Sequence, residues 1–135
     1  MSGGRTRALD LVCVGRTCVD LYAEQEGAKL EDVQSFRKYV GGSATNIALN
    51  TARLGMKTAM LTRMGEEQMG RFVRKTMTET GVDVSHVTFD PERLTPYVLL
   101  AIRNIEGFPR IFAVASHTAM SIVPMATERS PWPPG

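Results

Sequence analysis

Strand-like apolar runs and helix-like apolar spacing alternate along the first half of the chain. Residues 9–14 form an apolar, β-branched run closed by a glycine, which is typical of a buried strand. Apolar and small side chains then recur at spacings of three and four over residues 44–52, which predicts a helix with Ser43 as its N-cap and Gly55 just beyond its end. Residues 58–64 form a second strand-like run. The order strand, helix, strand predicts a right-handed βαβ unit with parallel strands.

A second amphipathic pattern follows the glycine at position 65. Glu66 and Glu67 favour a helix N-terminus here, because carboxylates interact well with the positive end of a helix dipole. Gly81 is placed to end the helix. The apolar stripe between these positions consists of Met69, Phe72, Val73 and Met77.

The remaining strand-like segments are shorter. Residues 21–26 and 36–40 precede the first helix, and residues 82–87 are a candidate strand after the second, followed by a turn at Asp90 and Pro91. The two strong strand candidates near the end are residues 97–102 and 110–115, which the loop 104–108 would join as an antiparallel hairpin. No period is evident beyond residue 115, and the final Pro-rich stretch fits neither a helix nor a central strand.

Composition narrows the function classes. The chain has 135 residues, of which 43% are hydrophobic, so one domain with a buried core is expected. Its 16 Lys and Arg nearly balance its 14 Asp and Glu and form no run, which gives no support for a nucleic-acid partner. No apolar stretch approaches the roughly 18 residues of a membrane helix. The polar N-terminus lacks the apolar core of a signal peptide, so we expect a cytoplasmic protein with no membrane partner.

The cysteines and histidines suggest no metal site. Cys13 and Cys18 are five residues apart, which is not a metal-binding spacing, and we expect two buried or half-buried thiols in a reducing compartment. His86 and His117 are isolated in the sequence, as surface or turn histidines are. The Walker, dinucleotide-binding and nucleophile-elbow motifs are all absent from the sequence, which disfavours a plain βαβ nucleotide-binding domain.

Gly41 and Gly42 directly precede the first predicted helix. Two glycines let the backbone approach a ligand closely and adopt positive φ, and the helix offers unpaired N–H groups and a partial positive charge. Asn46, in or near the first turn, carries an amide that both donates and accepts. The combination suits a neutral, polyhydroxylated ligand better than a bare phosphate. A tight turn before an N-capped helix would give the same local pattern.

Asp20 is placed just past the end of the first predicted strand. In open α/β sheets, ligands bind beyond the carboxyl ends of the strands, and a carboxylate there can accept two hydroxyl hydrogen bonds. An ordinary turn aspartate is the alternative.

Several blocks of the sequence occur in a specific order. They are residues 11–15 (LVCVG), Asp20, residues 41–48 (GGSATNIA), residues 52–55 (ARLG) and residues 64–70 (MGEEQMG). In this order they resemble the ribokinase-like (PfkB) carbohydrate kinases, and the likeness runs from residue 9 to residue 115. The family more often has Asp where Glu66 stands.

The resemblance implies an α/β fold with a doubly wound parallel sheet and a small β-lid, present here as an incomplete domain. Residues 8–115 would be the N-terminal substrate-binding part, and residues 116–135 an irregular, Pro-rich tail. The lid strands would be residues 21–26, 36–40, 97–102 and 110–115. Family lids can mediate pairing, so a homodimer through the lid is a further expectation.

The implied activity is transfer of the ATP γ-phosphoryl group to a sugar hydroxyl, with Mg²⁺. The implied substrate contacts are Asp20, Gly41, Gly42 and Asn46, with Arg103, in or just after a predicted lid strand, as a further candidate. The family's catalytic Asp lies in a Gly-Ala-Gly-Asp block near a late helix, and nothing in this chain matches that block or most of the nucleotide site. We therefore expect no kinase activity from this chain alone, since phosphoryl transfer depends on positioning and electrostatics.

Within the family, further stretches resemble the members that phosphorylate 5-dehydro-2-deoxygluconate in myo-inositol breakdown. They are residues 15–16, 19–22, 24–25, 30–32, 35–39, 92–95 and 108–109. The alternatives are a kinase for another sugar, such as ribose, fructose or 2-keto-3-deoxygluconate, and a non-catalytic sugar-binding or dimerisation module.

Overall fold

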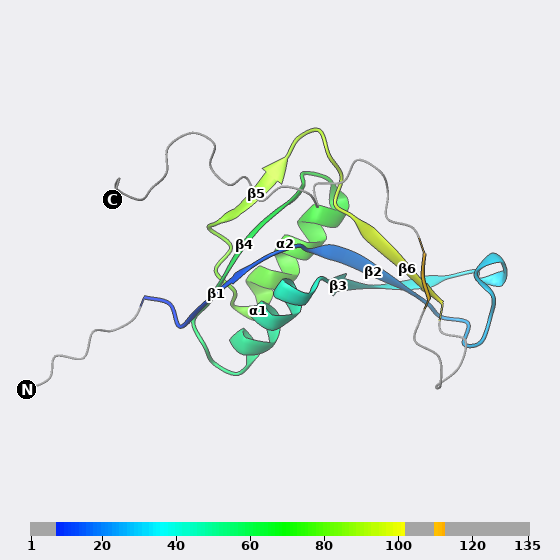
Figure 1. Ribbon diagram of the computed structural model, residues 1–135, viewed down its shortest axis with the longest axis horizontal. Coiled ribbons are helices and arrows are strands. Elements are labelled where there is room, and N and C mark those ends of the chain that lie inside the picture. The colour runs from blue at the N-terminus through cyan, green and yellow to red at the C-terminus, as the bar shows by residue number, and fades with distance from the viewer. Residues whose placement is uncertain (1–7, 102–109, 113–135) are drawn as a thin grey trace, which may run out of the picture.

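The computed structural model describes residues 8–101 and 110–112 (Figure 1). Its elements, in chain order, are β1 (Leu11–Val14), β2 (Cys18–Ala23), the 3-10 helix η1 (Leu30–Asp32), β3 (Phe36–Gly41), α1 (Ser43–Arg53), β4 (Thr58–Gly65), α2 (Gln68–Thr80), β5 (Val87–Asp90), β6 (Tyr97–Ala101) and β7 (Arg110–Phe112). Arg103, the loop 104–108 and the tail 116–135 lie outside the described residues.

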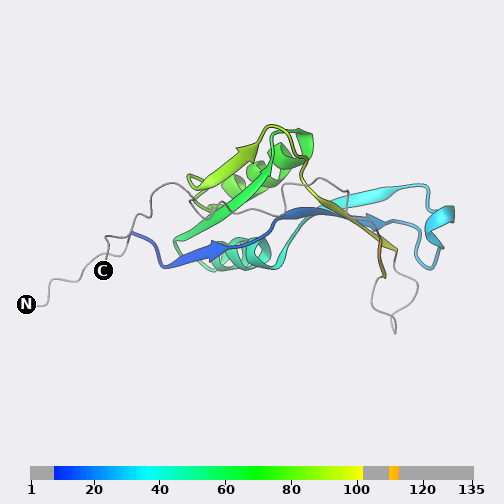
Figure 2. The same ribbon diagram turned by 45° about the horizontal axis from the view of Figure 1, so that its top comes forward.

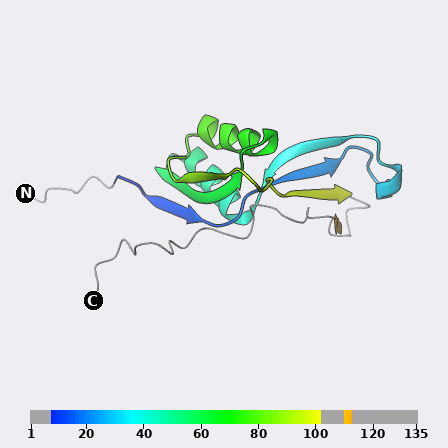
Figure 3. The same cartoon turned by 90° about the horizontal axis from the view of Figure 1, so that it is seen from above.

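The strands form two sheets. The first has the order β1-β4-β5 with both pairings parallel, and α1 lies between β1 and β4 in the chain, as predicted for the βαβ unit. The second sheet, called the lid below, has the order β3-β2-β6-β7. Its β2–β3 and β6–β7 pairs are antiparallel, and β2 and β6 are parallel. Figures 2 and 3 show the lid extending away from the helices, which confirms a partial parallel α/β sheet with a β-lid.

Both helices pack on one face of the first sheet. Side chains alternate across a strand, and on this face Cys13 of β1 lies beside Met60 of β4. Leu49 of α1 and Val73 of α2 join them in a single buried cluster. Burying a side chain of this size stabilises the fold by about 1.5–3 kcal/mol, so this face supplies the main core.

Helix α2 begins and ends as the sequence predicts. The Glu67 carboxylate caps it by accepting hydrogen bonds from two first-turn N–H groups, and Gly81 ends it with a left-handed φ of 91°. In the predicted stripe, Val73 and Met77 are fully buried, and Met69 and Phe72 pack against the core cluster. No helix in the described part of the chain is long and apolar enough to cross a membrane.

The start of α1 differs from the prediction. Ser43 is the first helical residue, and Gly42, with φ of 97°, occupies the N-cap position without any side-chain cap. A Cβ on Gly42 would overlap the carbonyl oxygen of Arg16, so a serine cannot take this place. The preference for a serine N-cap is thus overridden by close contact with a distant loop. Gly55 follows the C-cap with φ of 89°, as predicted.

The candidate strand at residues 82–87 is also wrong. Only a single bridge joins Asp83 to Ala59, and the ladder with β4 begins at Val87. Asp83 Oδ1 instead accepts a hydrogen bond from the N–H of Ser85 at 2.8 Å, which forms a local turn. The strand is β5, displaced toward the predicted turn at Asp90.

The opposite face of β1 is uncovered in the described part of the chain. Val12 and Val14 keep 50% and 57% of their surface exposed, although adjacent parallel strands are usually covered on both faces.

We expect the chain to self-associate through this uncovered face of β1. The double change Val12→Thr, Val14→Thr should reduce association while preserving strand propensity. Sedimentation velocity measures this, with Leu54→Thr, an exposed position in the loop after α1, as the control. A monodisperse wild-type monomer at high concentration would contradict the expectation.

Candidate functional site

Asp20 lies within a strand of the lid. It is the third residue of β2, which begins at Cys18, so its predicted place just past the end of the first strand is wrong. The chain leaves β1 at Val14 and re-enters a sheet after three residues, because Val19 is fully buried and its N–H bonds the carbonyl of Pro96 at 2.9 Å. Asp20 therefore has the fixed backbone of a strand rather than that of a turn.

Burial shapes the charge around Asp20. Burial raises the pKa of Asp20, and a hydrogen bond from the Cys18 thiol opposes that shift. Burial, followed by the Asp20 charge, raises the pKa of Cys18 to about 12, so the thiol stays protonated and donates to Oδ1 at 3.5 Å. Cys13 is buried, Cys18 is half-buried, and both are free thiols, as predicted.

Gly41 lies directly against the Asp20 carboxylate. A Cβ built on Gly41 would overlap this carboxylate and lie 2.6 Å from its Oδ2. Gly41 itself is buried at the end of β3, opposite Cys18. Glycine at this position is thus what allows the carboxylate to lie where it does.

Asn46 lies in the first turn of α1, above the second glycine. Its Nδ2 donates to the carbonyl oxygen of Gly42 at 3.1 Å, and the Asn46 N–H donates to the same oxygen at 2.9 Å. The amide is thereby held in one orientation, with Oδ1 as its acceptor. No side chain caps α1, so no side chain bonds the first backbone N–H groups at this end of the helix.

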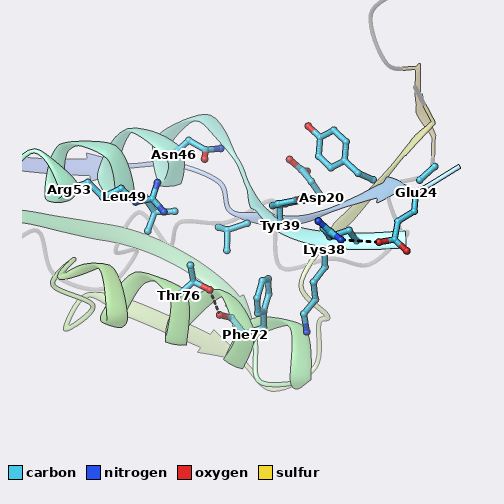
Figure 4. A pocket seen from close by; sticks show the side chains of 13 residues that line it. Asp20, Glu24, Lys38, Tyr39, Asn46, Leu49, Arg53, Phe72 and Thr76 are labelled. Carbon is cyan, nitrogen blue, oxygen red and sulfur yellow. Dashed lines mark hydrogen bonds and ion pairs between the residues drawn. The ribbon is translucent and has the colours of Figure 1, made fainter. Parts of the chain in front are cut away.

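One cavity of about 910 Å³ brings these features together. Asp20 and Asn46 both line it, and Figure 4 shows them on neighbouring elements at the junction between α1 and the lid. Phe72 and Thr76 of α2 line its other side. A cavity of this size accommodates a small sugar. In the described residues no three His, Cys, Asp or Glu side chains are grouped to hold a metal ion.

The family model described as pfkB family carbohydrate kinase matches residues 8–119. The chain belongs to the pfkB family of carbohydrate kinases.

Relatives of this pfkB chain have one recurrent name. The chain is 46% identical over 84 residues to the 5-dehydro-2-deoxygluconokinase of Geobacillus kaustophilus, and the match covers 62% of this chain and 25% of the relative. It is 40% identical over 86 residues to the enzyme of that name from Bacillus subtilis, covering 64% and 26%. The chain thus spans about a quarter of the length of these curated relatives.

Solved structures agree with the pfkB fold. A PfkB protein from Polaromonas sp. JS666 superposes with a TM-score of 0.75 at 30% identity, covering 84% of this chain and 37% of that one. An uncharacterized sugar kinase from Pyrococcus horikoshii in complex with ATP has a TM-score of 0.74 at 24% identity, covering 82% and 35%. The second likeness supports the fold alone.

The residue block 64–70 of this pfkB chain has a structural role. Glu67 accepts hydrogen bonds from the N–H groups of Met69, Gly70 and Thr95 at 2.6, 3.1 and 3.0 Å. The Thr95 hydroxyl in turn accepts from the N–H of Gly65 at 3.1 Å. Because Thr95 lies two residues before lid strand β6, this network fixes the lid to the end of β4 and the start of α2.

The structure brings four of the five predicted site residues together. Asp20, Gly41, Gly42 and Asn46 form a continuous group at the junction of the first sheet and the lid, and Arg103 lies outside the described residues. The sequence reasoning did not single out Tyr22, Arg37 and Tyr39, which line the same cavity. Residues 36–40 are strand-like in the sequence, and the alternation of side chains along a strand puts Arg37 and Tyr39 on one face, which is the available signal.

Proposed function

We propose that this chain forms the substrate-binding part of an ATP-dependent sugar kinase whose substrate is 5-dehydro-2-deoxygluconate, an intermediate of myo-inositol catabolism. The single observation that carries the proposal is that Asp20 and Asn46 line one cavity, with Gly41 against the Asp20 carboxylate. The names of the relatives in Geobacillus and Bacillus support the choice of substrate.

Each residue has a distinct task in this proposal. The Asp20 carboxylate accepts hydrogen bonds from two sugar hydroxyls, and Asn46 Oδ1 accepts from another. Gly41 and Gly42 let the ligand approach the backbone at the uncapped end of α1. Arg103 is proposed as a further substrate contact from the lid.

ATP and Mg²⁺ belong to the proposed activity of the whole kinase. In the described residues no three His, Cys, Asp or Glu side chains are grouped to hold a metal ion, and the sequence has no Gly-Ala-Gly-Asp block. No step is therefore assigned to these groups, and we propose that the chain binds substrate without transferring phosphate. The second candidate is a non-catalytic sugar-binding or dimerisation module, for which lid edge strand β3 offers a pairing surface.

Calorimetric titration of the purified chain with 5-dehydro-2-deoxygluconate tests the binding site. Asp20→Asn is expected to weaken binding by about 10- to 100-fold, since hydrogen bonds to charged groups contribute roughly 1.5–3 kcal/mol and 1.4 kcal/mol equals tenfold. Asn46→Ala is expected to weaken it by about 2- to 10-fold, since a neutral hydrogen bond contributes roughly 0.5–1.5 kcal/mol. Gln68→Ala is the control, because Gln68 also carries an amide, is exposed at the start of α2 and does not line the cavity.

The outcomes separate the parts of the proposal. If the wild-type chain binds no sugar or sugar acid, the proposed function is wrong. If it binds but Asp20→Asn and Asn46→Ala bind equally well, the site is elsewhere. Phosphorylated product after incubation with ATP and Mg²⁺ would show that the chain alone is an active kinase, contrary to the proposal.

A further inference from the structure

Arg37 lies on the same face of the lid as Asp20. In the β2–β3 ladder, Asp20 is opposite Tyr39 and Tyr22 is opposite Arg37. Residues opposite each other, and residues two apart on one strand, project from the same face. The rings of Tyr22 and Tyr39 confirm this, with centroids 5.5 Å apart and planes at 88°.

Three cationic side chains line the cavity, and two of them are directed elsewhere. Lys38 projects from the opposite face of β3, and Figure 4 shows it extending toward Phe72, with Nζ 4.3 Å from the ring centroid. Arg53 is bonded through Nη1 to Asn50 Oδ1 at 3.1 Å. Of these three cations, only Arg37 shares the Asp20 face.

The present partners of Arg37 leave it able to bind an anion. Its Nη2 lies 3.4 Å from Glu24 Oε1, and these two side chains are 67% and 41% exposed. An exposed pair of this kind contributes little to stability, so a ligand carboxylate can replace or share it. Tyr39 also lines the cavity, and its interaction with the guanidinium is the largest cause that raises the pKa of Arg37.

The separation of the two groups matches a sugar acid. Arg37 stands two residues beyond the partner of Asp20, which places the two positions about 7 Å apart along the strands at roughly 3.4 Å per residue. An extended six-carbon acid spans such a distance, with hydroxyls at one end and a carboxylate at the other. A planar guanidinium can bind that carboxylate through two parallel hydrogen bonds.

We propose that Arg37 binds the carboxylate of a sugar acid whose hydroxyls are held by Asp20, and that Arg37 thereby sets a preference for acids over neutral sugars. The inference rests on the proposed function, because it concerns the same cavity. It assigns recognition of the negative charge of the substrate to one side chain of the lid, Arg37.

The test compares 5-dehydro-2-deoxygluconate with its methyl ester, which lacks the negative charge and carries one added methyl group. Arg37→Gln is expected to weaken binding of the acid about 10- to 100-fold, as for loss of a charged hydrogen bond, and to change ester binding less than twofold. Arg37→Lys should retain part of the preference. Lys75→Gln is the matched control, because it removes the same charge from an exposed position of α2 that does not line the cavity, and it should leave both affinities unchanged. Both positions are exposed, so unchanged melting temperatures are expected and serve as the check on folding.

The results distinguish this inference from the proposed function. A wild-type chain that binds the acid and the ester equally, or an Arg37→Gln variant that keeps the wild-type preference, overturns the role of Arg37 and leaves the Asp20 site standing. Equal loss of both ligands in Arg37→Gln also overturns it, because the effect would not depend on the carboxylate. A wild-type chain that binds neither ligand contradicts both proposals.

Discussion

Gly41→Ala is expected to remove most ligand binding while leaving the fold intact. The added methyl group would overlap the Asp20 carboxylate, which is the free end of a side chain and can rotate away. Stability should change by less than about 1 kcal/mol, since Ala is the better residue in a strand by up to that amount. Affinity should fall about 10- to 100-fold, because the displaced carboxylate loses hydrogen bonds worth roughly 1.5–3 kcal/mol. Titration and thermal unfolding of the same samples measure the two effects separately.

Gly55→Ala provides the matched control for Gly41→Ala. Gly55 has φ of 89° and open space where its Cβ would lie, so the change costs about 1–2 kcal/mol of backbone strain without touching the cavity. Binding by the folded molecules should be unaffected. A double-mutant cycle sharpens the test, because Gly41→Ala should have no further effect on binding once Asp20→Asn is present. Additive effects of the two changes would mean that Gly41 does not act through Asp20.

The residues that could be placed from the sequence are those controlled by their near neighbours. Gly81 ends α2 because only a residue that accepts positive φ can follow the last turn, and a glycine after an apolar stripe signals this locally. Gly55 follows α1 for the same reason. The diglycine before α1 was also visible, because two adjacent glycines at a helix start are informative without any tertiary contact.

The errors arose where distant residues decide the outcome. The N-cap of α1 is Gly42 rather than Ser43, because the carbonyl of Arg16 occupies the space that a side chain would need. Asp20 belongs to a strand because β2 pairs with β3 and β6, which are separated from it by long stretches of chain. No periodicity within a short window contains this information.

The position of Arg37 shows an intermediate case. Alternation predicts which residues of a strand share a face, but the register between two strands decides which of them meet a given partner. Once Asp20 is known to lie opposite Tyr39, Arg37 follows at the next position on that face. The sequence alone therefore predicted a cavity for hydroxyl groups and missed the cation beside it.

Glu67→Ala is expected to cause the largest loss of stability among the changes proposed for this chain. The carboxylate caps α2, which contributes up to about 2 kcal/mol, and it also satisfies the N–H of Thr95, whose burial without a partner costs roughly 1–3 kcal/mol. We therefore expect a loss of about 2–4 kcal/mol in the free energy of unfolding, measured by urea denaturation. Glu66→Ala is the control, since this exposed neighbour should change stability by less than about 0.5 kcal/mol. Equal effects of the two changes would refute the proposed connection between the lid and α2.

The pH dependence of the Glu67→Ala effect follows from the hydrogen bonds. Burial raises the pKa of Glu67, but hydrogen bonds from Thr95, Met69 and Gly70 together outweigh it, so the net pKa lies below its usual value. A depressed pKa in the folded state means that the stabilisation is complete above the unfolded pKa, near 4.3, and is lost as pH falls through the folded pKa. The stability difference between wild type and Glu67→Ala should hence be constant from pH 6 to 8 and shrink below about pH 4. Taking the difference between the two proteins removes the other titrating carboxylates, such as Asp83 and Asp90, from the comparison. A difference that persists undiminished at pH 3 would show that the ionised carboxylate is not what joins the lid to the first sheet.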